Sequence, residues 1–205
     1  MELKYVGAKP SVSAKGVTFD QTKPDRYTFL NAAVELLEAL SFDVTGDKKL
    51  YLYNVSGKEL NGSELVEMLK KHCAEPEKAF ENVQEKTNEM IEKYTKGVDE
   101  NDGLLVDERR AWLNNIEIMR DYYLQYITNE SAYECALNAL VDKIHDSHIE
   151  EVTFPIGRNY GLVLSHLVDV LRDYKPPYDA LLSFEDKDGI AMGKLDMNRP
   201  KPLDL

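Results

Sequence analysis

The chain has 205 residues, of which 43% are hydrophobic and 30% are charged, and its formal net charge at pH 7 is −12. This length is enough for one domain with a substantial core. The acidity argues against a sequence-independent nucleic-acid binder and against docking on an anionic membrane, because both depend on Lys and Arg, and it favours the encounter with a basic protein partner.

The first third of the chain alternates short strands with helices. Period-two alternation predicts strands over residues 3–6 and 17–19. Apolar residues spaced three and four apart predict an amphipathic helix over 26–41. The aromatic and branched run at 50–55 predicts a strand, and a short helix is expected over 64–72.

A third helix and an exposed loop follow. Pro76 suits the first turn of a helix that continues to about Lys96. The outer face of this helix alternates Glu and Lys, which we interpret as a solvated surface. Residues 97–105 are rich in Gly and acidic side chains, so they predict an exposed loop and are the candidate for a hinge.

The segment Trp112–Ile127 is the feature around which we expect the fold to be organised. On a helical wheel its apolar side chains cover roughly 240°, about twice the stripe of an ordinary surface helix, so we expect neighbours on most sides. We place this central helix at about residues 106–128. Asn129 is predicted to end it, and the capping-box spacing of Ser131–Glu134 predicts the start of another helix.

The last third combines a helix with strands. Residues 150–154 are interpreted as a short strand or an extended connector. Pro155 opens a helix whose apolar residues between Tyr160 and Tyr174 follow heptad spacing, which we interpret as core packing rather than a coiled coil. A hairpin is predicted over 180–197, with a turn at 186–189.

An isolated hairpin is barely stable in water, so the C-terminal hairpin needs partner strands. The predicted fold is α+β and predominantly helical, with about six helices packed around the central helix at 106–128. Its small antiparallel sheet is built from the N-terminal strands, the 50–55 strand and the C-terminal hairpin. We predict a single globular domain over 1–197, followed by a flexible tail at 198–205.

Three features predict a cytosolic protein. No apolar run approaches the roughly 20 residues of a membrane span. The segment Met1–Val6 lacks the apolar centre of a secretory signal. Cys73 and Cys135 are too few for a disulfide framework, so we expect both thiols to be reduced.

Two polar side chains, Asn115 and Arg120, project into the apolar arc of the central helix. Burying an unpaired guanidinium is costly, so Arg120 is expected to pair with a carboxylate or extend to water. A structural contact is the simpler interpretation, and an anion-binding arginine in a pocket is the functional one. Arg158, next to Gly157 near a helix start, is a second candidate for anion binding.

The segment Asp142–Glu151 carries side chains typical of metal sites. Asp142 and His145 are three residues apart, as are His145 and His148, so each pair can share a helix face. Imidazole and carboxylate together suit zinc or iron. Histidines near a helix end also complement the helix dipole, and we favour this solvated terminus over a metal site. No other cofactor is expected.

Tyr122 and Tyr126 lie close together on the central helix, and we favour core packing for them over an interface. His72 and Cys73 diverge by about 100° on a helix, which excludes a dyad and predicts a packed Cys73 beside an exposed His72. His166 is also expected to be exposed.

The sequence contains no recognisable catalytic set, such as a P-loop, a Gly-x-Ser-x-Gly elbow or a His-Glu-x-x-His helix. It therefore predicts a cytosolic binding or regulatory protein that contacts a protein partner or itself, without nucleic acid or membrane. The alternative is a metal-binding protein or metal-dependent enzyme that uses the Asp142–Glu151 segment.

Overall fold

The computed structural model describes residues 3–4, 8–20, 26–42, 48–52, 60–73, 75–155, 160–173, 179–188 and 190–199. Its fold is α+β and mostly helical, as predicted. The helical elements are α1 (Arg26–Phe42), α2 (Gly62–His72), the 3-10 segment η1 (Pro76–Phe80), α3 (Val83–Asp99), α4 (Val106–Asp146) and α5 (Tyr160–Asp173). The strands are β1 (Pro10–Ser13), β2 (Gly16–Phe19), β3 (Lys49–Tyr51), β4 (Glu151–Pro155), β5 (Asp179–Lys187) and β6 (Ile190–Arg199).

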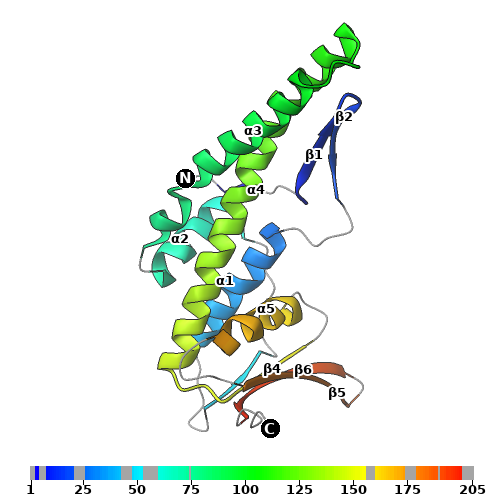
Figure 1. Cartoon of the computed structure of the whole chain (residues 1–205). Helices are drawn as coiled ribbons and strands as arrows, with labels where there is room; N and C mark the ends of the chain where they lie inside the picture. Colours follow the sequence, from blue (N-terminus) through cyan, green and yellow to red (C-terminus); the bar gives the residue numbers. More distant parts are fainter. Residues whose placement is uncertain are drawn as a thin grey trace.

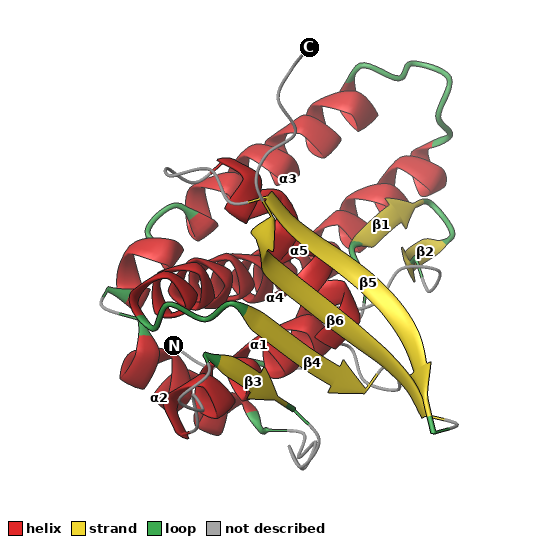
Figure 2. Ribbon diagram, turned by 90° about the horizontal axis from the view of Figure 1, so that it is seen from below, coloured by secondary structure: helices red, strands yellow, loops and turns green. Residues whose placement is uncertain are grey.

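The elements are arranged along one long helix, α4. The outer half of α4 forms a helical hairpin with α3 that projects away from the rest of the molecule (Figure 1). At the other end lies a four-stranded sheet, with α5 between it and the helices α1 and α4. Figure 2 shows the strand order β3-β4-β6-β5, in which β3 is parallel to β4 and the other pairs are antiparallel.

The structure differs from the prediction in the N-terminal strands. The predicted strand at 17–19 lies in β2, but its partner β1 is Pro10–Ser13 and not the predicted strand at 3–6, of which residues 3–4 are not in a strand and residues 5–6 lie outside the described residues. The two strands β1 and β2 form a separate sheet beside the outer half of α4 and do not join the main sheet. The buried apolar residue of this hairpin, Val12, packs against Val98 of α3 and against Ile116 and Met119 of α4, and half-buried Val17 packs against the same cluster. Since this cluster gives the hairpin its own apolar partner, it has no need of the main sheet.

The structure also corrects the predicted end of the central helix. The helix α4 runs without a break for 41 residues, so Asn129 does not end it and Ser131–Glu134 does not start another. Both Asn129 and Ser131 are buried inside the helix. The Nδ2 of Asn129 donates to the carbonyl of Lys4 at 3.0 Å, so the polar side chain is satisfied by a tertiary contact and no cap is needed.

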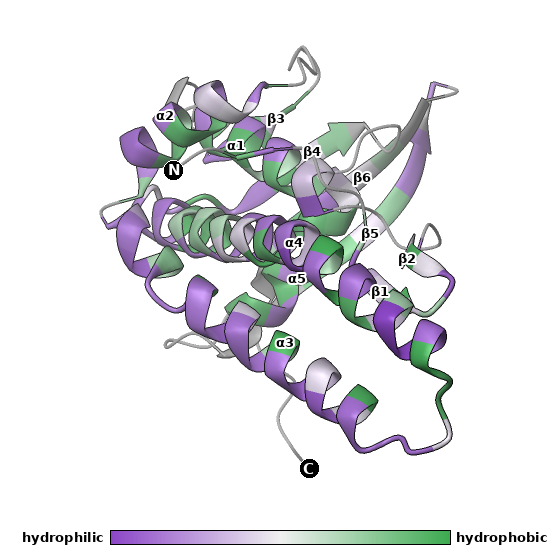
Figure 3. Cartoon of the chain, turned by 90° about the horizontal axis from the view of Figure 1, so that it is seen from above, coloured by the Kyte–Doolittle hydropathy of each residue, from purple (hydrophilic) through white to green (hydrophobic). Residues whose placement is uncertain are grey.

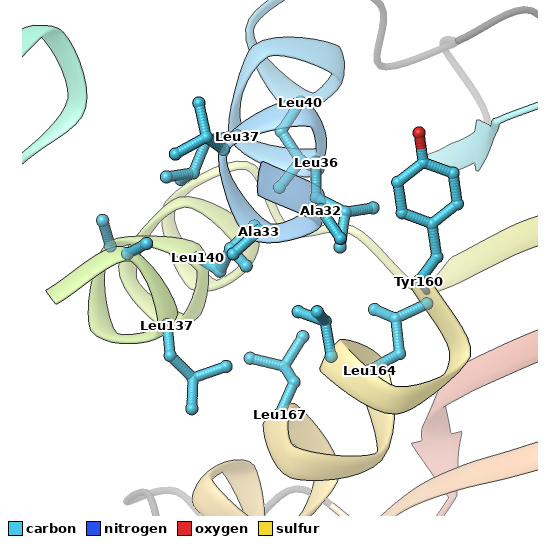
Figure 4. Packing of buried hydrophobic residues seen from close by; sticks show 14 of the residues in the cluster. Ala32, Ala33, Leu36, Leu37, Leu40, Leu137, Leu140, Tyr160, Leu164 and Leu167 are labelled. Carbon is cyan, nitrogen blue, oxygen red and sulfur yellow. The ribbon is translucent and has the colours of Figure 1, made fainter. Parts of the chain in front are cut away.

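The main core surrounds the inner half of α4 rather than the segment Trp112–Ile127. Figure 4 shows side chains of α1, α4 and α5 pointing toward one another, among them Leu37, Leu140 and Leu164, which are 0–1% exposed. In the outer half, Ile118 and Tyr122 are 52% and 42% exposed. The wide apolar arc of the sequence is therefore shared between a small outer core and an open surface.

Several predicted boundaries shift by a few residues. The helix α3 continues to Asp99, so the predicted 97–105 loop begins only after it. The strand β6 includes residues 198–199, and the remainder of the predicted tail lies outside the described residues. Residues 150–154 lie almost wholly in β4, which confirms the strand interpretation. No helix in the described ranges combines the length and the apolar character needed to cross a membrane.

The side chain of Phe154 lies between α5 and the sheet, and it limits which residues can replace Gly193. Phe154 is fully buried, and it pairs in register with Gly193. A Cβ at Gly193 would lie 2.2 Å from Cζ of Phe154. We expect Gly193→Ala to lower the free energy of unfolding by about 1–3 kcal/mol in a urea titration followed by circular dichroism, because the ring has no room to move.

Gly161 provides a matched control for this substitution. A Cβ at Gly161 would lie 3.5 Å from Cε2 of the same ring, which is an ordinary contact. We expect Gly161→Ala to stay within about 0.5 kcal/mol of the wild type. Equal effects of the two substitutions would contradict the packing described here.

Candidate functional site

A groove lies between α3, α4 and the β1 side of the small hairpin, in the projecting half of the molecule. Its volume is about 710 Å³. Figure 3 shows α3 as hydrophilic over most of its length, with isolated hydrophobic residues. The groove is lined by Lys9, Pro10, Lys86, Glu89, Met90, Lys93, Tyr94, Gly97, Val98, Asn101, Leu104, Trp112 and Tyr123.

One wall of the groove is positioned by polar contacts from α4 to the β1–β2 hairpin. The Nδ2 of Asn115 donates to the carbonyl oxygens of Ser13 at 2.8 Å and Ala14 at 3.3 Å. On the next turns of α4, Tyr122 meets Phe19 edge to face, with ring centroids 5.2 Å apart. The structure thus places two predicted binding residues, Asn115 and Tyr122, at the contact that holds the hairpin on α4.

The floor of the groove is apolar. Val98 is 5% exposed, and half-buried side chains of Met90, Leu104, Trp112 and Tyr123 surround it. Burial, followed by the charge of Glu130, raises the pKa of Tyr123, so this side chain stays a neutral donor. Trp112 is the single tryptophan of the chain, which makes the floor directly observable by fluorescence.

The rim of the groove is cationic, although the chain as a whole is acidic. Lys9, Lys86 and Lys93 line it and are exposed, and among the described lining residues Glu89 is the single acidic one. Within the described part of the chain, none of these three lysines is engaged in an ion pair. The described lining of the groove therefore carries three lysines against one carboxylate.

A second hollow, of about 600 Å³, continues the groove toward α1 and α5. It shares Lys9, Pro10 and Tyr94 with the groove. Its remaining lining residues are Ala8, Ser11, Asp20, Arg26, Phe29, Tyr126, Leu162 and His166. Because the two spaces have three lining residues in common, they adjoin, and together they are called the concave surface below.

The wall of this hollow contains a paired arginine. The Nε of Arg26 donates to Oε1 of Glu130 at 3.1 Å, and the hydroxyl of Tyr126 donates to the same oxygen at 2.8 Å. The Arg26 guanidinium also lies over the rings of Phe29 and Tyr133, at 5.5 and 5.7 Å from their centroids. Burial and the Glu130 contact raise the pKa of Tyr126 to about 12, so Tyr126 remains protonated.

His166 completes the wall from α5. Its Nδ1 lies 2.9 Å from the hydroxyl of Tyr133. Burial, followed by the charge of Arg26, lowers the pKa of His166, and burial raises that of Tyr133 to about 12. Tyr133 is therefore the donor to a neutral imidazole, and the prediction of an exposed His166 is wrong.

The remaining predicted site residues lie elsewhere. Arg120 is exposed on α4 and lines neither the groove nor the hollow. Arg158 lies outside the described residues. Of the four predicted binding residues that the structure describes, Tyr126 alone lines the concave surface, and Asn115 and Tyr122 support one wall of it.

The predicted metal ligands lie at the C-terminal end of α4. His148 follows the C-cap residue Ser147 and has a positive φ of 51°, as is common just after a helix end. His145 Nδ1 lies 3.4 Å from a carboxylate oxygen of Asp146. Across the described ranges no group of three or more His, Cys, Asp or Glu is placed to hold a metal ion, Asp142 included.

His72 and Cys73 point to different partners, as their helical divergence predicts. The side chain of His72 is 2% exposed, with Nε2 2.5 Å from Oε1 of Glu38, so the prediction of an exposed His72 is wrong. Cys73 is buried and its thiol donates to the carbonyl of Cys135 at 3.6 Å. The predicted absence of a His72–Cys73 dyad agrees with these contacts.

The lysines of the groove are not among the site residues predicted from the sequence. Lys86 and Lys93 are seven residues apart on α3, and Met90 and Gly97 lie on the same strip. This spacing of cations beside an apolar residue was the available signal, and the alternation of Glu and Lys on the same helix obscured it. No protein-family model, curated protein or solved structure matches the chain.

The lowered pKa of His166 gives a pH-dependence prediction. In an unfolded chain the pKa of a histidine side chain is about 6.5. Below that pH the imidazole of His166 is protonated in the unfolded chain more readily than in the folded protein. The free energy of unfolding therefore falls as the pH is lowered through this range. We expect His166→Gln to lose less stability than the wild type between pH 7.5 and 5.5 in urea titrations.

A direct titration checks the cause of this effect. The midpoint of His166 in the folded protein, followed by NMR of the imidazole carbons, should lie below about 6.5. His72, whose pKa is also lowered by burial, stays in both proteins and so cancels in the comparison. Identical pH slopes for wild type and variant would contradict the assignment.

Proposed function

We propose that this chain is a binding protein whose groove between α3, α4 and β1 takes an acidic segment of a partner protein. The observation that carries the proposal is the cationic rim of Lys9, Lys86 and Lys93 above an apolar floor, on a chain with a net charge of −12. The acidic side chains of such a segment are attracted electrostatically to these lysines at the groove. The overall charge favours a basic partner on encounter, so the groove selects a short acidic stretch rather than a wholly acidic molecule.

The floor of the groove supports apolar anchors within such a segment. Aromatic side chains in desolvated centres dominate the binding energy of many interfaces. Trp112, Tyr123 and Met90 offer a half-buried surface of this kind. An acidic segment with one or two aromatic or leucine side chains therefore matches the groove in both charge and polarity.

The adjoining hollow supports a ligand longer than one anchor. It continues from Lys9 and Tyr94 to Arg26 and His166, where neutral His166 and protonated Tyr126 can take part in hydrogen bonds. Arg26 already neutralises Glu130, so this end contributes hydrogen bonds rather than net charge. An extended peptide fits this succession better than a compact anion does.

We infer a cytosolic location, which two free cysteines support. A nucleic acid is a poor ligand, because three lysines on a chain of net charge −12 give little counterion release. A second copy of this chain is the competing occupant, and the experiment below distinguishes it.

We predict that charge reversal on α3 weakens the binding of an acidic peptide. Random peptides displayed on phage are selected on the full chain, and the enriched sequences are expected to be acidic with an aromatic or leucine anchor. A synthetic peptide from this set should change the emission of Trp112. Lys86→Glu combined with Lys93→Glu should weaken its binding at least about tenfold, equivalent to about 1.4 kcal/mol, and added salt should weaken binding to the wild type.

The matched control is Lys15→Glu combined with Arg120→Glu, which reverses the same number of exposed charges outside the groove. It should bind the peptide as the wild type does. A loss of binding in the control alone would move the site to Arg120. Failure to enrich acidic peptides, or a light-scattering mass that doubles as Trp112 emission shifts, would overturn the proposal.

A further inference from the structure

Two cysteines that are 62 residues apart in sequence meet on the side of the molecule where α2 ends against α4. Cys73 is the C-cap residue of α2, and Cys135 lies in the middle of the inner half of α4. The Sγ of Cys73 lies 3.6 Å from the carbonyl oxygen of Cys135, so the two cysteines are direct neighbours. Neither thiol is part of the groove or of the hollow beside it.

The two thiols can be reached from solvent. Both line a surface hollow of about 540 Å³ that lies apart from the groove. Cys73 itself is 7% exposed, whereas Cys135 is half-buried. The exposed residues Glu75, Lys78, Glu134, Asn138 and Asp142 share the lining, so the hollow opens to the surface and admits a small reagent.

The environment makes the two thiols unequal. The neighbouring Cys73 side chain lowers the pKa of the Cys135 thiol, against the opposing effects of burial and of the charge of Glu77. The same contact, followed by burial, raises the pKa of the Cys73 thiol. Cys135 is also the more exposed of the two residues, so a reagent in the hollow reaches its sulfur first. Since the thiolate is the nucleophile, Cys135 is the thiol that attacks the reagent, and Cys73 then attacks Cys135.

We propose that Cys73 and Cys135 form a dithiol site that a hydroperoxide oxidises to an intramolecular disulfide. The Cys135 thiolate attacks one peroxide oxygen, the O–O bond breaks, and a sulfenic acid forms while the second oxygen leaves with a proton. The Cys73 sulfur then attacks the Cys135 sulfur, the S–O bond breaks, and water leaves. With hydrogen peroxide, two thiols lose two hydrogen atoms and the peroxide becomes two molecules of water.

The local structure allows this bond to form. Cys135 is held in a continuous helix, whereas Cys73 stands at a helix end with extended backbone angles (φ −101°, ψ 128°). The backbone at Cys73 is thus the part free to adjust toward disulfide geometry. The product links the end of α2 to α4 and leaves the groove residues untouched.

The test is exposure of the full chain to hydrogen peroxide, followed by intact mass and peptide mapping. The wild type should lose the mass of two hydrogen atoms per chain, remain monomeric on a non-reducing gel, and yield a Cys73–Cys135 linked peptide. Cys73→Ser should stop at a sulfenic acid on Cys135 that dimedone traps. Cys135→Ser should leave Cys73 as a thiol, with oxidation at least tenfold slower.

A second measurement on the wild type does not depend on the folding of the variants. Iodoacetamide at neutral pH should alkylate Cys135 at least tenfold faster than Cys73, as read by peptide mapping over time. Absence of the intramolecular link, links between chains only, or faster alkylation of Cys73 would overturn the proposal. Each of these outcomes is independent of peptide binding in the groove.

Discussion

The buried amide of Asn129 is the contact on which the architecture depends. It lies where α4 passes from the outer cluster to the main core, and an unsatisfied amide there would cost about 1–3 kcal/mol. The carbonyl of Lys4 accepts from its Nδ2, and Gln125 donates to its Oδ1 at 3.4 Å. Because both ends of the amide are satisfied, the helix continues and one rigid element serves two cores.

This arrangement explains why the long helix has two different characters. Around its inner half, small residues such as Ala132 and Ala136 are fully buried and let α1 approach closely. Around its outer half, α3 and the β1–β2 hairpin cover part of the surface and leave a concave strip with Trp112 at its floor. The projecting half thus combines a fixed backbone with an incompletely covered apolar surface, which is the combination that recognition of a flexible segment requires.

Local patterns in the sequence were sufficient for most of the elements. The three-and-four spacing of apolar residues predicted α1, and the turn-flanked alternation at 180–197 predicted the hairpin of β5 and β6. They were not sufficient where a tertiary contact decides. The capping-box spacing at Ser131 was misleading because this side chain is buried and has a role in packing. No sequence pattern near Asn129 predicts that the carbonyl of Lys4 accepts its hydrogen bond.

The candidate sites were harder to predict for the same reason. Asn115 was identified as an unusual polar residue, but its partners at Ser13 and Ala14 lie about a hundred residues earlier. His166 and Cys135 acquire their properties from Tyr133 and Cys73, which belong to other helices. The groove combines three elements with unrelated local patterns, so its charge is visible only once α3 and β1 are brought together.

The position of the β1–β2 hairpin has a consequence for the order of folding. Its anchor to Asn115 spans 102 residues, whereas the hairpin itself is made of neighbouring residues. A chain synthesised from its N-terminus exposes the hairpin first, and its binding surface on α4 exists only after the α3–α4 pair has formed. The wall of the groove is therefore among the last parts of this half to be completed, after the two helices that it covers.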